Sequence, residues 1–104
     1  MKYIQVFTTV AKIADADRIA TALVKEKLAA CVQIVGPVRS TYCWKGKTVR
    51  STEWLCIIKT ERPRYGRLEA RLRAVHPYEL PEIFAVPCVA GSPEYLKWVS
   101  EQMR

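Results

Sequence analysis

The sequence predicts an α+β domain in which two helices pack on one face of an antiparallel sheet. Segments with period-two alternation, segments with helical spacing, and the order of the two kinds along the chain predict it. That order is β-α-β-β-α-β with a short helix at the end, which is the split βαβ, or ferredoxin-like, arrangement. The 104 residues suffice for one core, so we expect residues 1–104 to form a single domain.

The first part of the chain contains a strand, a helix and a second, longer strand. Tyr3–Thr9 alternates and is rich in β-forming residues. Asp15–Lys27 has the apolar spacing of an amphipathic helix, with Asp15 placed to cap its N-terminus. Cys31–Trp44 is a long strand, and the missing backbone donor at Gly36-Pro37 predicts a bulge or bend at a sheet edge.

The central part of the chain predicts a hairpin that is long for so small a domain. Lys45-Gly46-Lys47 forms the turn, and Val49–Thr60 is the returning strand. The consecutive apolar residues of Trp54–Ile58 indicate a strand covered on both faces. Trp44 and Trp54 lie on facing strands, where they pack across the hairpin or contact another subunit. Strands of this length leave apolar surface and an unpaired edge, so the pattern predicts oligomerisation.

The last part of the chain alternates helix, strand and helix. Pro63–Val75 is a helix with an apolar stripe, and Pro77 ends it. Ile83–Val89 is a strand in which Pro87 favours an edge position. The final helix begins with Ser92 as its N-cap and proline as its first residue.

The chain carries a formal net charge of +7 and a pI near 9.5, which raises the possibility of nucleic-acid binding. The richest basic cluster lies on the helix 63–75 without interleaved aromatic residues, so it indicates a solvated helix face, and RNA binding is a distant alternative. No apolar run approaches the roughly 20 residues of a membrane span, and the first residues enter a strand pattern. We therefore expect a cytoplasmic protein without a membrane partner.

The reactive residue types argue against catalysis and against a preformed zinc site. The cysteines are widely spaced, without a C-x-x-C motif, which predicts buried, reduced thiols at Cys31, Cys43, Cys56 and Cys88. His76 is the only histidine, and no serine or cysteine nucleophile stands at motif spacing from it. The sequence thus predicts a protein that is not an enzyme.

Several sequence blocks together resemble the CutA family. They are Leu28-Ala29-Ala30-Cys31-Val32-Gln33, Tyr42-Cys43-Trp44-Lys45-Gly46-Lys47, Glu53 to Lys59-Thr60, His76-Pro77-Tyr78-Glu79-Leu80-Pro81-Glu82-Ile83 and Tyr95-Leu96-Lys97-Trp98. The resemblance implies a ferredoxin-like homotrimer, similar in architecture to the PII proteins, with long hairpins pairing across subunits and clefts at the subunit boundaries. It also implies a link to tolerance of divalent cations, notably copper.

Copper in a protein prefers imidazole nitrogen or sulfur ligands, so Cys31 and His76 are the candidate metal residues for Cu²⁺ or another divalent cation. Some family members carry a cysteine at the end of the first strand and a second histidine before the proline motif. Here these positions are Thr8 and Val75, so both ligands are absent.

The loop after the second helix offers a second candidate site at the implied subunit cleft. Its His76, Tyr78, Glu79 and Glu82 supply a nitrogen, a hydroxyl and two carboxylates, which suit a hard cation or a small polar ligand. Alternatively, the histidine caps the helix end while the prolines only rigidify the loop. Two functions therefore compete: a trimeric responder to a metal ion or small ligand, and a structural or interaction scaffold.

Overall fold

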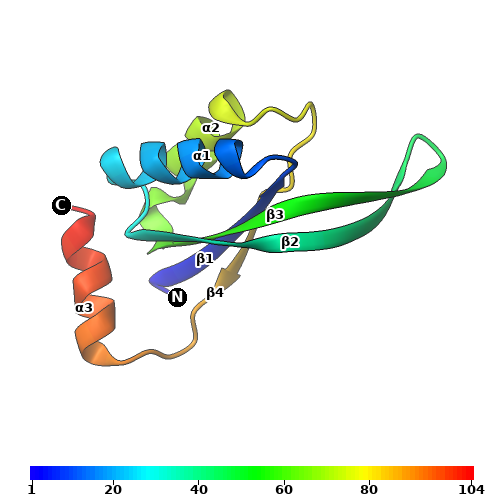
Figure 1. Ribbon diagram of the computed structural model, residues 1–104. Helices are drawn as coiled ribbons and strands as arrows, with labels where there is room; N and C mark the ends of the chain where they lie inside the picture. Colours follow the sequence, from blue (N-terminus) through cyan, green and yellow to red (C-terminus); the bar gives the residue numbers. More distant parts are fainter.

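The computed structural model describes all 104 residues and confirms the predicted order of elements (Figure 1). The elements are β1 (Tyr3–Val10), α1 (Ile13–Lys25), β2 (Cys31–Trp44), β3 (Lys47–Glu61), the 3₁₀ turn η1 (Arg62–Arg64), α2 (Tyr65–Val75), β4 (Phe84–Pro87) and α3 (Pro93–Gln102). The four strands form one sheet in the order β2-β3-β1-β4, and all neighbours are antiparallel. The fold is therefore the expected α+β arrangement.

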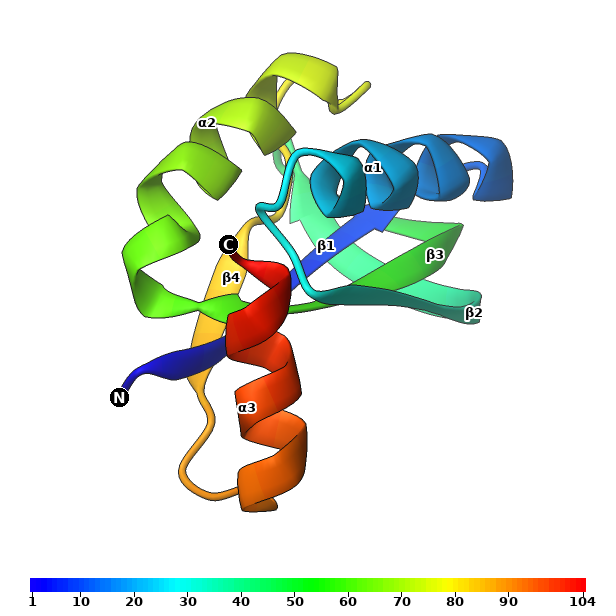
Figure 2. The same ribbon diagram turned by 90° about the vertical axis from the view of Figure 1, so that its left-hand side faces the viewer.

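Helices α1 and α2 cover one face of the sheet, and α3 lies on its other side (Figure 2). Alternate residues of β1 and β3 enter the core between the sheet and α1 and α2, among them Val6, Cys56 and Ile58. Leu68 and Leu72 of the predicted α2 stripe are fully buried against them. None of the helices combines the length and the apolar content needed to cross a lipid bilayer.

Side-chain hydrogen bonds attach helix α3 to the sheet. Ser92 caps it as predicted, accepting a hydrogen bond from the Tyr95 backbone N–H at 3.2 Å. The Ser100 hydroxyl donates to the Glu61 carboxylate at 2.6 Å, which leaves Ser100 Oγ to accept from the Tyr3 hydroxyl at 2.6 Å. These bonds connect the first strand, the third strand and the last helix.

Helix α1 corrects one expected boundary. It begins at Ile13, and no side chain caps its first turn. Asp15 lies inside that turn and forms an ion pair with Arg18 at 2.8 Å, so the predicted Asp15 cap is wrong. A carboxylate in the first turn still interacts favourably with the positive end of the helix dipole.

Both edge predictions made from prolines are confirmed. Strand β2 is at one edge, and its pairing with β3 shifts register between Val35 and Val38, at Gly36-Pro37. Strand β4 is at the other edge and carries Pro87, although it is shorter than the predicted segment 83–89. Prolines are accepted at these places because an edge strand or a bulge can lose one ladder hydrogen bond.

The structure does not stack the two hairpin tryptophans on each other. Trp44 lies opposite Lys47 at the tip, whereas Trp54 pairs with Val10 of β1 and packs over the bulge. A Cβ atom at Gly36 would lie 2.5 Å from Cε3 of Trp54, closer than any real contact. The glycine is thus required by the close approach of the indole.

The cysteines differ in exposure, and none is in a disulfide. Only Cys56 fulfils the prediction of a buried thiol; Cys31 and Cys88 are half-buried and Cys43 is exposed. Burial, with a smaller contribution from Asp17, raises the pKa of the Cys56 thiol to about 11. This core thiol therefore stays protonated and unreactive at neutral pH.

We expect Gly36→Ala to destabilise the protein by roughly 1–3 kcal/mol, because the new methyl group forces the Trp54 indole out of place. Gly66→Ala is the matched control: nothing lies within 4 Å of its Cβ position, and alanine is the better helix former, so it should add roughly 0.5–1 kcal/mol. Urea unfolding measures both. Equal effects of the two substitutions would contradict the steric account.

Thr8→Val should stabilise the protein by about 1 kcal/mol, since the fully buried Thr8 hydroxyl is the one enclosed side-chain polar atom without a hydrogen-bond partner. Thr60 is equally enclosed, but its hydroxyl donates to the Leu28 carbonyl at 2.7 Å. Thr60→Val should therefore cost about 1 kcal/mol. Thermal unfolding at one fixed protomer concentration tests the pair, and a loss of stability in both variants would refute the assignment.

Candidate functional site

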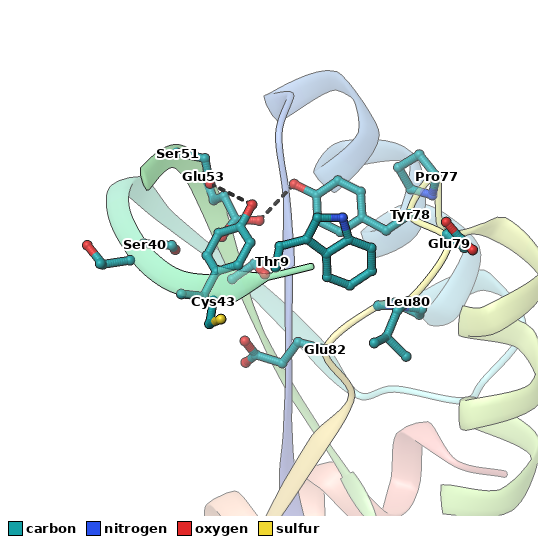
Figure 3. Close-up of a pocket in the computed structure, with 14 residues that line it drawn as sticks. Thr9, Ser40, Cys43, Ser51, Glu53, Pro77, Tyr78, Glu79, Leu80 and Glu82 are labelled. Carbon is teal, nitrogen blue, oxygen red and sulfur yellow. Dashed lines mark hydrogen bonds between the residues drawn. The ribbon is translucent and has the colours of Figure 1, made fainter. Parts of the chain in front are cut away.

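A cavity of about 940 Å³ lies where the β2–β3 hairpin meets the loop that follows α2 (Figure 3). Strand β1 contributes one wall residue, the hairpin contributes seven, and the loop 77–82 contributes the rest. The lining residues are Thr9, Ser40, Thr41, Tyr42, Cys43, Trp44, Ser51, Glu53, Pro77, Tyr78, Glu79, Leu80, Pro81 and Glu82. The predicted loop residues Tyr78, Glu79 and Glu82 are thus brought together around one cavity.

The cavity wall combines aromatic rings with carboxylates. Tyr42, Trp44 and Tyr78 are the aromatic residues, and the carboxylates belong to Glu53, Glu79 and Glu82. No lysine or arginine lines the cavity, although the chain holds 17 of them against 10 acidic residues. The site therefore has the opposite charge from the protein as a whole.

Tyr78 connects the loop to the hairpin at the inner end of the cavity. Its hydroxyl donates to Oε2 of Glu53 at 2.7 Å, as the dashed line in Figure 3 shows. Burial and the adjacent Glu53 carboxylate raise the pKa of Tyr78 well above its usual range. Tyr78 therefore remains a neutral donor that fixes the position of the carboxylate.

His76 lies behind the cavity and positions Tyr78. Its Nδ1 accepts a hydrogen bond from the Tyr78 backbone N–H at 3.1 Å, so the ring proton is on Nε2, which donates to the Thr9 carbonyl at 3.0 Å. The ring is buried, and this burial lowers the pKa of His76 below its ordinary value despite the bond to Thr9. A neutral ring gains nothing from the helix dipole. Both ring nitrogens are hydrogen-bonded, so neither is free to bind a metal in this arrangement.

The structure does not bring Cys31 and His76 together. Cys31 pairs with Lys59 on β3, whereas Thr9, the partner of the histidine ring, pairs with Leu55. No group of three or more histidine, cysteine, aspartate or glutamate side chains converges in a metal-binding arrangement. A single chain therefore does not assemble the Cys31–His76 copper site that residue chemistry suggested.

Thr8 and Val75, which replace ligands of some relatives, also face the core. Thr8 is fully buried, and Val75 packs against the main cluster of apolar side chains. Glu53 is the acidic cavity residue that the sequence analysis did not identify. The available signal was an acidic residue inside a strand-forming run, directly before Trp54.

His76→Ala should lower the free energy of unfolding by about 2 kcal/mol at pH 7.5, because two hydrogen bonds and their buried ring are lost. The fold depresses the histidine pKa, so its contribution is complete above the ordinary value of 6.5 and declines as the pH falls below it. The difference between wild type and variant should therefore shrink from pH 7.5 to 5. A difference that grows in acid would mean that the folded ring is charged.

Comparison with known proteins agrees with this fold along almost the whole chain. The family profile described as "CutA1 divalent ion tolerance protein" matches residues 4–102. A relative from Thermus thermophilus, named "Divalent-cation tolerance protein CutA", is 45% identical over 96 residues, which are 92% of this chain and 93% of that protein. "Protein CutA, chloroplastic" from Arabidopsis thaliana is 40% identical over 97% of this chain, which spans 56% of that longer protein.

A solved structure has the same fold. The crystal structure of CutA from Xylella fastidiosa superposes with a TM-score of 0.96 at 38% sequence identity, covering 100% of both chains. Because a relative above carries a chloroplastic name, the cytoplasmic location of this chain stays a prediction. Profile, relatives and structure together show that the chain belongs to the CutA1 divalent ion tolerance protein family.

Proposed function

We propose that this protein acts in divalent-cation tolerance as a binding protein, without catalysis, and that the cavity between the hairpin and the loop after α2 is where it takes its ligand. The observation that carries the proposal is a cavity with three carboxylates and no basic side chain in a protein of net charge +7. The names of its relatives supply the biological context. The His76 ring is neutral and both of its nitrogens are hydrogen-bonded, which supports a role other than acid–base catalysis.

The donor set favours a hard cation over copper. Glu53, Glu79, Glu82 and Tyr78 offer oxygen atoms, the ligands that Mg²⁺, Mn²⁺ and Ca²⁺ prefer, whereas the histidine nitrogens are occupied. The exposed Cys43 is the one soft ligand on the wall. Since the acidic residues do not converge within one chain, waters or a neighbouring subunit would complete the coordination.

An exposed apolar sheet face supports self-association into the homotrimer that the family resemblance implies. One row across the sheet joins Phe84, Phe7 and Ile57, and the adjacent row joins Leu55 and Val35. These residues alternate with the buried ones, so they face away from α1 and α2. Phe84 is 61% exposed and Val35 is 45% exposed. A second copy of the chain has the same neutral, apolar surface and can cover it.

The projecting hairpin supports the same proposal. Residues 38–44 of β2 and 47–53 of β3 pair only with each other, because the pairing with β1 ends at Trp54. A two-stranded ribbon has two free edges and little independent stability. A neighbouring subunit that pairs with the hairpin would remove these edges and enclose the cavity. The same surface also suits the alternative function, a scaffold that binds no metal.

Native mass spectrometry with and without Mn²⁺ and Cu²⁺ tests both functions. We expect a trimer that takes up Mn²⁺ more strongly than Cu²⁺. Uptake should decrease at least about tenfold in the double variant Glu79→Gln/Glu82→Gln, because two charged ligands are lost. The control is Glu94→Gln/Glu101→Gln on α3, far from the cavity lining, which should leave uptake unchanged.

The same spectra test assembly. Phe84→Lys should shift the mass towards monomer, because it puts a charge on the most exposed residue of the apolar face. Val89→Lys replaces an even more exposed apolar residue in the loop before α3 and should leave the trimer intact. A stable trimer without uptake of either metal would support the scaffold, and a monomeric wild type would refute the assembly.

A further inference from the structure

Glu53 is a buried carboxylate without a cationic partner. The residue is 5% exposed, and the Tyr78 hydroxyl gives it its only side-chain hydrogen bond, to Oε2. None of the four ion pairs in the chain includes Glu53. Removing a carboxylate from water is costly unless a cation compensates it. Glu53 therefore leaves an uncompensated negative charge at the cavity, which a cation from outside the chain could pair with.

The nearby arginines of the hairpin do not supply that charge. Arg39 pairs with Thr52, and Arg50 pairs with Thr41, so both alternate to the opposite side of the hairpin from Glu53. Lys47, opposite Trp44 at the tip, is on the same side as Glu53, but it forms no ion pair and does not line the cavity. The carboxylate remains reachable from the cavity, because Glu53 lines the cavity and its Oε1 is not among the enclosed, unbonded polar atoms. An incoming cation can thus approach Oε1 without displacing the Tyr78 hydroxyl from Oε2.

Aromatic rings form one part of the cavity wall. Tyr42 and Trp44 are 43% and 39% exposed, large values for aromatic residues of a strand pair, and Tyr78 joins them in the lining. The face of an aromatic ring attracts a cation, and tryptophan does so most strongly. The Lys45 ammonium lies 5.7 Å from the Trp44 ring centroid, a cation–π contact within the chain that a ligand has to displace or share. Pro77 and Leu80 add apolar carbon to the wall.

A bare metal ion makes no use of these rings, whereas an organic ammonium ion uses rings and carboxylate together. We propose that the cavity binds a small organic ammonium ion, with its charge against Glu53 and its carbon atoms against Tyr42, Trp44 and Tyr78. This inference rests on the cavity being the ligand site of the proposed function and names a second class of cation for it. Glu79 and Glu82 at the same cavity add to the negative potential that attracts such an ion.

Tetramethylammonium chloride is the probe, titrated into the intact protein at constant ionic strength and followed by the backbone amide NMR shifts of the cavity residues, which every variant retains. Saturable binding is the expected result. Glu53→Gln should weaken it about tenfold or more, because the glutamine keeps the shape but removes the charge. Trp44→Leu should weaken it roughly 2–5-fold, which corresponds to one exposed cation–π contact.

Matched variants separate the cavity from general surface effects. Trp98 on α3 is 40% exposed, nearly the same as Trp44, but does not line the cavity, so Trp98→Leu should leave binding unchanged. Glu94→Gln should also have no effect. The uncharged analogue tert-butanol should not bind. Equal binding by tert-butanol, unchanged affinity in Glu53→Gln, or no saturation would each overturn the inference.

A parallel Mn²⁺ titration distinguishes this inference from the function proposed above. Competition between the two cations supports both. Mn²⁺ uptake without tetramethylammonium binding overturns the inference and leaves the metal function standing; the reverse result supports the inference and removes the metal function. If the wild type binds no tetramethylammonium and Glu53→Gln dissociates the trimer, a neighbouring subunit supplies the missing charge, and the inference is wrong.

Discussion

The unequal lengths of β1 and β3 determine most of what is unusual in this molecule. Strand β3 has 15 residues and β1 has eight, so β1 can pair with only the second half of β3. The first half of β3 continues past the sheet with β2 as its sole neighbour. One consequence is a projecting ribbon with free edges; the other is a corner where the sheet stops and the loop after α2 can reach the hairpin. The cavity occupies that corner (Figure 3).

Two residues of the loop hold this corner together. The His76 ring binds the last part of β1 through the Thr9 carbonyl and binds the loop through the Tyr78 backbone, while the Tyr78 side chain extends to Glu53 on β3. The chain of contacts thus links strand, loop and hairpin, and each bond constrains the next group. A histidine that is committed in this way is a positioning residue. Its effect on the cavity is to fix the backbone of Tyr78, whose hydroxyl then bonds Glu53.

Local sequence signals predicted the elements because each depends on neighbouring residues only. The prolines at positions 37 and 87 marked a bulge and an edge, and Ser92 marked a helix start. The cavity could not be predicted in the same way. The bulge adds one residue to β2, so odd-numbered residues such as Val35 pair with odd residues of β3 before it, and even-numbered ones such as Tyr42 do so after it. Which side chains share a face with Glu53 therefore depends on the register.

The same dependence explains why the soft-metal hypothesis did not fit the fold. Cys31 pairs with Lys59 of β3, whereas the Thr9 carbonyl that binds His76 belongs to a residue paired with Leu55 of β3. These two positions follow from strand register, which residue chemistry alone does not reveal. Likewise, Asp15 has the composition of a cap, but the helix begins earlier and uses it in its first turn. These misplacements share one cause: a residue type indicates what chemistry is possible, whereas strand register and helix start determine which groups meet.

The proposed cation site is electrostatically consistent with a protein of net charge +7. Exposed charges are screened over about 8 Å at physiological ionic strength, whereas a buried charge is screened much less. The arginines exposed along α2 therefore act weakly at the cavity, and the enclosed carboxylate of Glu53, with no basic side chain in the lining, dominates the local potential. The overall basic charge describes the solvated surface, and the sign of the site is set by the few groups that the hairpin corner encloses.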